Sequence, residues 1–96
     1  MRFEWDDAKN RSNLKKHGVE FETAKLVFED PHQMSVQDRI VDGEERWQTF
    51  GFVDGLIVMA AHTLREEDGE EVIRFISVRS ATPRERRIYE ANKASS

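Results

Sequence analysis

The stretch EVIRFISVRSATPRERRIYE, residues 71–90, decides the C-terminal half of the fold. Residues 72–81 are rich in β-branched and aromatic side chains and contain neither Gly nor Pro, which is typical of a strand. Thr82 and Pro83 then supply a helix N-cap and a first-turn proline, and Glu85 completes a capping-box pattern. The stretch therefore predicts a strand that leads directly into a C-terminal helix.

The first turns of this predicted helix carry three arginines, Arg84, Arg86 and Arg87. The helix dipole makes this end of a helix unfavourable for cations, so their position suggests that something anionic binds nearby. The alternative interpretation is a basic helix face that is simply solvated.

Charge is distributed unevenly along the chain. The net charge of −4 and the pI near 5.4 do not suggest a basic nucleic-acid-binding domain. Residues 18–71, however, hold four Lys and Arg against fourteen Asp and Glu, whereas residues 72–96 hold six against two. Residues 1–17 are also basic, with five against three. This asymmetry favours a protein with a basic working surface and an acidic remainder.

Length and composition limit the protein class. Ninety-six residues predict one domain, residues 1–96, with one modest core. The chain has no cysteine, so disulfides, thiol chemistry and cysteine-based zinc sites are excluded. No apolar run approaches the ~18 residues of a membrane span, and the N-terminus lacks a signal-peptide pattern. We therefore expect a cytoplasmic protein, with a loose tail only at residues 94–96.

The N-terminal segment reads as a short strand, residues 2–5, followed by a helix. Asp6 is placed to cap this helix and Gly18 to end it. Lys16 and its neighbour His17 lie in the last turn, where the helix dipole favours cations. A role for Lys16 in nucleic-acid binding therefore competes with a purely structural explanation.

The remaining pattern predicts an α+β fold. Apolar residues at helical spacing indicate a second helix over residues 21–29. Asp54-Gly55 and Asp68-Gly69 are two-residue hairpin signals. The other expected elements are a short strand at 32–36, a polar exposed loop at 37–45, and strands at 46–53 and 56–65. The order β-α-α-β-β-β-β-α gives a small antiparallel sheet with two N-terminal helices packed on it and a C-terminal helix.

Two-residue turns also predict the strand registers. They place Arg46 opposite Thr63, Trp47 opposite His62, and Thr63 opposite Arg74. With strict alternation, one face is expected to carry Trp47, Ala60, His62, Phe75, Ser77 and Arg79. The other face is expected to gather Arg46, Gln48, Thr63, Arg65 and Arg74 at one end. Its opposite end is expected to hold Phe50, Phe52, Ile57, Met59, Ile76 and Val78.

Polar groups within such a small sheet need an explanation, because burying an unpaired guanidinium is costly. Arg65 and Arg74 have a structural alternative, a salt-bridge lattice with the acidic residues Glu44, Glu45, Glu66, Glu67 and Glu71. His62 has one as well, a hydrogen bond inside the sheet.

The functional interpretation is metal-free cleavage of RNA. RNA supplies its own nucleophile, the 2′-OH, so an enzyme needs a base, an acid and cations that stabilise the phosphorane charge. We predict His62 for proton transfer and Arg46 and Arg79 for charge stabilisation. Contacts to RNA are predicted for Arg65, Arg74, Arg84, Arg86, Arg87 and Lys16. Neither a metal nor a cofactor is expected, because the three histidines are scattered and no phosphate-binding loop is present. A binding module that cleaves nothing is the alternative.

Four stretches together resemble the BrnT family of toxins. They are FEWDDAKNRSNLKKHGVEFETAKLVFED (3–30), GEERWQTFG (43–51), AAHTLRE (60–66) and IRFISVRSATPRERRIYE (73–90). The resemblance implies a RelE-like fold, metal-independent RNA cleavage and inhibition of translation. It also implies a BrnA-like antitoxin that carries a ribbon-helix-helix DNA-binding part, so that DNA is contacted only through the antitoxin. The residues that fall at the family's polar sheet and helix positions are Arg46, His62, Arg65, Arg79, Arg84 and Arg86.

Overall fold

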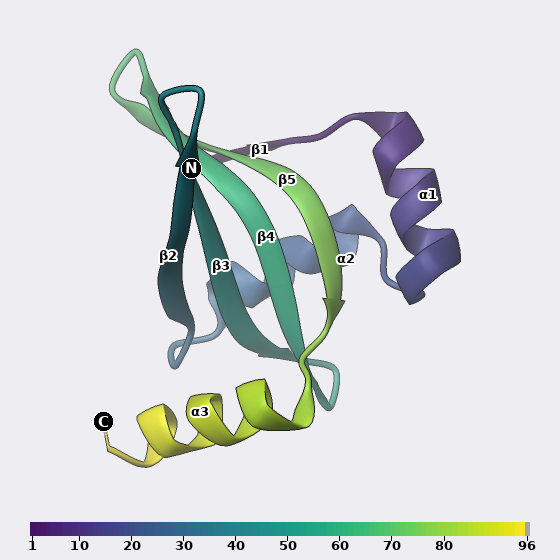
Figure 1. The fold of residues 1–96 in the computed structure, drawn as a ribbon, viewed down its shortest axis with the longest axis vertical. Coiled ribbons are helices and arrows are strands. Elements are labelled where there is room, and N and C mark those ends of the chain that lie inside the picture. The colour runs from purple at the N-terminus through teal and green to yellow at the C-terminus, as the bar shows by residue number, and fades with distance from the viewer. Residues whose placement is uncertain (96) are drawn as a thin grey trace.

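A five-stranded sheet organises the computed structural model, which describes residues 1–95 (Figure 1). The strand order is β1-β5-β4-β3-β2. All neighbouring pairs are antiparallel except β1 and β5, which run parallel. The strands are β1 (Arg2–Glu4), β2 (Met34–Val41), β3 (Glu44–Val53), β4 (Leu56–Glu67) and β5 (Glu70–Ser80).

The helices divide between the two faces of the sheet. The helix-side face is covered by α1 (Asp7–His17), α2 (Phe21–Ala24) and the 3₁₀ helix η1 (Lys25–Glu29). The other face, which we call the open face, is covered only at one end, by α3 (Pro83–Ala94) (Figure 1). The predicted α+β class and the order of the elements are confirmed, and the second predicted helix is divided into α2 and η1.

The predicted helix boundaries follow from local hydrogen bonds. The Asp6 carboxylate accepts a hydrogen bond from the backbone of Ala8, and Gly18 ends α1 in the left-handed conformation with φ 73°. At α3, the Thr82 hydroxyl accepts from the backbone of Glu85, while the Glu85 carboxylate accepts from the backbone of Thr82. The predicted capping box is therefore present.

The predicted loop at 37–45 is wrong, and so is the tail at position 94. β2 continues to Val41, and Asp42-Gly43 forms a two-residue turn with φ 52° and 77°, like the turns at Asp54-Gly55 and Asp68-Gly69. Most β2 residues are exposed, because β2 is an edge strand, so the apolar alternation that marks a half-buried strand is absent. α3 includes Ala94, and Ser96 lies outside the described residues.

A β-bulge corrects the predicted faces. The predicted pairing of Arg46 with Thr63 between β3 and β4 is confirmed, and so is that of His62 with Phe75 between β4 and β5. Beyond His62, however, the β4–β5 register shifts by one residue and pairs Ala61 with Ser77. The extra residue moves Ser77 and Arg79 from the predicted face of His62 to the open face. Val78 moves the other way, into the core beneath the N-terminal helices.

Two apolar clusters lie on opposite sides of the sheet. On the helix side, Phe21 and Val27 pack with Phe75 and other strand residues. On the open face, Tyr89 of α3 packs with Phe50 at the end of the sheet that α3 covers. The rest of the open face is not covered by a described helix, and it presents polar side chains.

Candidate functional site

A row of polar side chains crosses the open face from β2 to β5. Arg39 lies in register with Arg46, Arg46 with Thr63, and Thr63 with Arg74. Residues in register on neighbouring strands present their side chains on the same face. We call these four residues the Arg46 row.

The centre of the row has unsatisfied polar atoms. Arg46 Nε and Thr63 Oγ1 are both buried, and neither has a hydrogen-bond partner within the described part of the chain. The whole Thr63 side chain is 0% exposed. Buried polar atoms are normally paired, and leaving one unpaired costs stability. The oxygen atoms of an anion would accept from both groups and offset the charge of Arg46 only if the side chains that cover these atoms moved aside.

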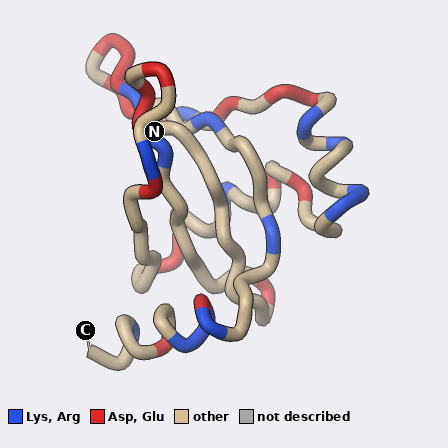
Figure 2. Tube along the Cα trace, in the orientation of Figure 1, with Lys and Arg blue, Asp and Glu red and all other residues tan. Residues whose placement is uncertain are grey.

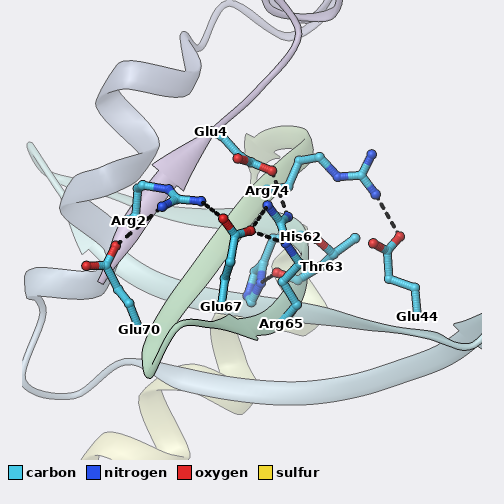
Figure 3. A network of polar contacts seen from close by, with 9 residues as sticks. All are labelled: Arg2, Glu4, Glu44, His62, Thr63, Arg65, Glu67, Glu70 and Arg74. Atoms are coloured by element: carbon cyan, nitrogen blue, oxygen red, sulfur yellow. Dashed lines mark hydrogen bonds and ion pairs between the residues drawn. The ribbon is translucent and has the colours of Figure 1, made fainter.

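Arg74, the last member of the row, and Arg65, which lies outside it, both form ion pairs (Figure 3). Arg74 Nη2 lies 2.6 Å from Glu44 Oε1, while Arg65 lies 2.7 Å from Glu4 Oε1 and 3.0 Å from Glu67 Oε2. The hydrogen bond from Arg65 lowers the pKa of Glu4 despite partial burial. A salt-bridge lattice of the kind predicted as an alternative therefore engages both arginines, although Glu4 was not among its predicted members.

Arg79 lies on the open face but far from the row. It pairs in register with Met59, four residues along β4 from Thr63, which is roughly 13 Å at the usual strand rise. Its guanidinium makes two contacts to Glu85, of 2.7 and 3.0 Å. The Arg79 hydrogen bond lowers the pKa of Glu85, and the carboxylate in turn raises the pKa of Arg79. This pair fastens the start of α3 to β5.

His62 lies on the helix-side face, with only 3% of its surface exposed. Its Nδ1 lies 2.9 Å from the Thr63 carbonyl oxygen, which can only accept, so Nδ1 carries the proton. Nε2 therefore accepts from the Thr49 hydroxyl at 2.7 Å, and Thr49 is itself bonded to Ser35. Burial lowers the pKa of His62, although the Thr63 carbonyl acts in the opposite direction. The predicted alternative, a hydrogen bond inside the sheet, describes this histidine.

The structure thus separates the predicted catalytic residues. Arg46 and Arg79 share the open face at different ends, while His62 faces Phe28 of η1 on the helix side. His62 borders a cavity of about 250 Å³ on the helix side, together with Trp47 and Glu71. A phosphate bound at Arg46 would not reach this cavity, because the sheet lies between them.

The predicted RNA-contacting residues outside the sheet lie in two places. Arg84, Arg86 and Arg87 are exposed on α3, and no ion pair involves them within residues 1–95. Lys16 lies on α1 beside a shallow pocket that Lys9 also borders. Figure 2 shows these basic positions on α1 and α3 and acidic residues at the tips of two hairpins.

Sequence reasoning missed Thr63 and Arg39 as members of the site. The predicted register already placed Thr63 between Arg46 and Arg74, so this position could have identified Thr63 as a member of the site. Arg39 was missed because its segment was predicted to be a loop.

Within residues 1–95, no three His, Asp or Glu side chains gather in a way that could hold a metal. None of the described helices has the length and apolar character needed to cross a membrane.

Comparison with known proteins identifies one family. The family model described as "Ribonuclease toxin, BrnT, of type II toxin-antitoxin system" matches residues 5–85. The matched range includes β2 to β5 and all of the Arg46 row. No curated protein matches the chain.

Proposed function

This chain belongs to the BrnT family of ribonuclease toxins of type II toxin–antitoxin systems, and on that premise we propose that it cleaves RNA without a metal ion and so inhibits translation in the cytoplasm. The observation that carries the proposal is the buried, unpartnered pair formed by Arg46 Nε and Thr63 Oγ1. A phosphate oxygen that reached both atoms, once the side chains that cover them moved aside, would satisfy them. The Arg46 row is then the substrate phosphate site.

In this proposal Arg46 stabilises the negative charge that develops on the phosphorus oxygens, with Thr63 and Arg74 as further contacts. The Glu44 carboxylate, 2.6 Å from Arg74, is the acceptor beside the row that we assign to the 2′-OH proton. The 2′ oxygen then attacks phosphorus and the bond to the 5′ oxygen breaks. The leaving 5′ oxygen takes a proton from solvent.

The other two predicted catalytic residues, Arg79 and His62, have different roles in this proposal. We propose that Arg79 acts by positioning, because both ends of its guanidinium are bonded to Glu85. Proton transfer by His62 stays a prediction, and it requires RNA to enter the helix-side cavity. Among the predicted RNA contacts, Arg84 borders a groove on the open face, whereas Lys16 lies on the helix-side layer.

The family implies an antitoxin partner. We propose that this antitoxin is BrnA-like, with a ribbon-helix-helix DNA-binding part. The toxin would then contact DNA only through its partner. RNA and antitoxin would both meet the open face of the sheet.

The test is cleavage of a 5′-labelled single-stranded RNA by the purified protein, with and without EDTA, and with added ribosomes. Cleavage should survive EDTA, and Arg46→Ala should reduce its rate by roughly 100-fold, as removal of a charge-stabilising donor does. Arg11→Ala, an exposed change on α1, is the matched control and should leave the rate unchanged. Loss of cleavage in EDTA would refute the metal-free mechanism. An absence of cleavage under every condition would favour a non-catalytic binding module.

A further inference from the structure

A groove of about 410 Å³ lies between α3 and the open face of β2 and β3. Its lining includes the apolar side chains of Met34, Val36, Phe50 and Ile88. Phe50 is buried at 4% exposure, whereas Val36 and Ile88 are each 47% exposed. The groove therefore has a buried apolar floor and exposed apolar walls.

The groove lining holds one arginine, Arg84, that forms no ion pair within the described residues, and one carboxylate, Glu85. Arg86 and Arg87 follow Arg84 on the same helix. All three are exposed and make no ion pair within the described residues. The carboxylate in the lining, Glu85, is already engaged by Arg79 and by the backbone of Thr82. A ligand that fits here combines apolar side chains with negative charge.

We propose that this groove is the docking site of the antitoxin. One amphipathic segment of the antitoxin places apolar side chains against Val36, Phe50 and Ile88, and a carboxylate of that segment pairs with Arg84. Apolar anchors in a groove with charge pairs at the rim are the usual composition of protein interfaces. This docking proposal rests on the proposed function in one respect, because it takes an antitoxin as the partner. It does not depend on RNA cleavage.

The position of the groove explains how docking would inhibit cleavage. Gln48 borders the groove and lies two residues from Arg46 on the same face of β3. This separation is roughly 7 Å at the usual strand rise. A segment seated in the groove therefore reaches the edge of the Arg46 row and blocks the approach of an RNA backbone.

The lining favours a protein over RNA as occupant. RNA binding draws on phosphate contacts from cations and hydroxyls, and the groove lining supplies only Arg84 and Thr82 as groups of these kinds. The groove floor, Met34 and Phe50, offers no hydrogen-bonding side chain. The apolar walls require apolar partners to gain from burial.

The experiment compares Ile88→Glu and Ile88→Lys with Leu26→Glu, a matched control on η1 with 41% exposure outside the groove. Affinity for the purified cognate antitoxin is measured by calorimetry, and cleavage of the labelled RNA is measured with the free toxin. Melting temperatures show that each variant is folded. Ile88→Glu should weaken antitoxin binding by roughly 30-fold or more, as expected for an interface anchor. Ile88→Lys should weaken it less, because the partner is acidic, and Leu26→Glu should not weaken it.

The outcomes separate the docking proposal from the proposed function. Weaker antitoxin binding with unchanged RNA cleavage supports the groove as the docking site. An unchanged antitoxin affinity in both Ile88 variants overturns the proposal. RNA cleavage that rises in Ile88→Lys and falls in Ile88→Glu, with antitoxin affinity unchanged, assigns the groove to RNA instead. If the parent protein cleaves no RNA, the proposed function fails, while the affinity series still decides the docking site.

Discussion

The hydroxyl of Tyr89, on α3, donates a hydrogen bond to the buried carboxylate of Asp30, at the end of η1. The same carboxylate accepts from the backbone of Phe52 at 2.7 Å and of His32 at 2.8 Å. The Asp30 side chain thus joins the C-terminal helix, strand β3 and the helix-side layer. The wall of the proposed docking groove depends on this connection, because Tyr89 fastens α3 to the sheet.

Tyr89→Phe should therefore lower the free energy of unfolding by roughly 1–3 kcal/mol, because it removes the donor to a buried carboxylate. Urea unfolding followed by circular dichroism measures the change. Ser95→Ala is the control, since it removes an exposed hydrogen bond at the end of the same helix. It should cost less than about 0.5 kcal/mol. Equal losses in the two variants would contradict the proposed importance of the Tyr89–Asp30 contact.

Asp30 should contribute to acid unfolding. Burial raises the pKa of Asp30, but the hydrogen bonds from Tyr89, Phe52 and His32 outweigh it and the net shift is downward. A carboxyl with a lowered folded pKa stabilises the protein above its unfolded pKa, near 3.9, and this contribution is lost as pH falls through the folded value. Tyr89→Phe removes one of these bonds and raises the folded pKa toward the unfolded value, so the variant should lose less stability than the parent protein as pH falls through this range. Melting temperatures between about pH 3 and pH 7 test this, and superimposable profiles would reject it.

His62 should make stability depend on pH near neutrality. Burial lowers its folded pKa, so the unfolded chain binds a proton more readily than the native state. The stabilisation is present above the unfolded pKa of about 6.5 and is lost as pH falls toward the folded pKa. His62→Gln should remove this loss, whereas His17→Gln should retain it. Nuclear magnetic resonance titration of the His62 ring provides a direct check, and a pKa at or above 6.5 would rule out the buried neutral form.

Thr63→Val should separate stability from function. The Thr63 hydroxyl is buried without a partner, so its removal should leave the free energy of unfolding unchanged or raise it. RNA cleavage should nevertheless fall by roughly tenfold if the hydroxyl contacts the phosphate, which corresponds to one modest hydrogen bond.

Thr49→Val is the matched control for that substitution. Thr49 is equally buried, at 0% exposure, but its hydroxyl is bonded to both His62 and Ser35. We expect a loss of roughly 1–3 kcal/mol, because the His62 acceptor is left unpaired. A destabilised Thr63→Val with full activity would show that the hydroxyl is structural.

Much of the fold could be predicted from local chemistry. Each Asp-Gly pair adopts the positive φ angles of a two-residue hairpin, so the turns set the registers from Arg46↔Thr63 to Thr63↔Arg74. Thr82 and Glu85 likewise mark the start of α3 through hydrogen bonds within one turn. These features depend only on residues close together in the chain, which is why the sequence by itself determined them.

The tertiary structure alone decided which polar side chains meet. The bulge in β5 moves Arg79 to the open face, and no turn signal marks it. Just beyond the bulge, the Asn13 side chain bonds both the amide and the carbonyl of Val78, a contact that spans 65 residues. Packing of η1 helps to bury His62 on one face, while the Arg46 row is left on the other. Such placements depend on contacts between distant segments, and their energies appear only when the sheet and its helices assemble.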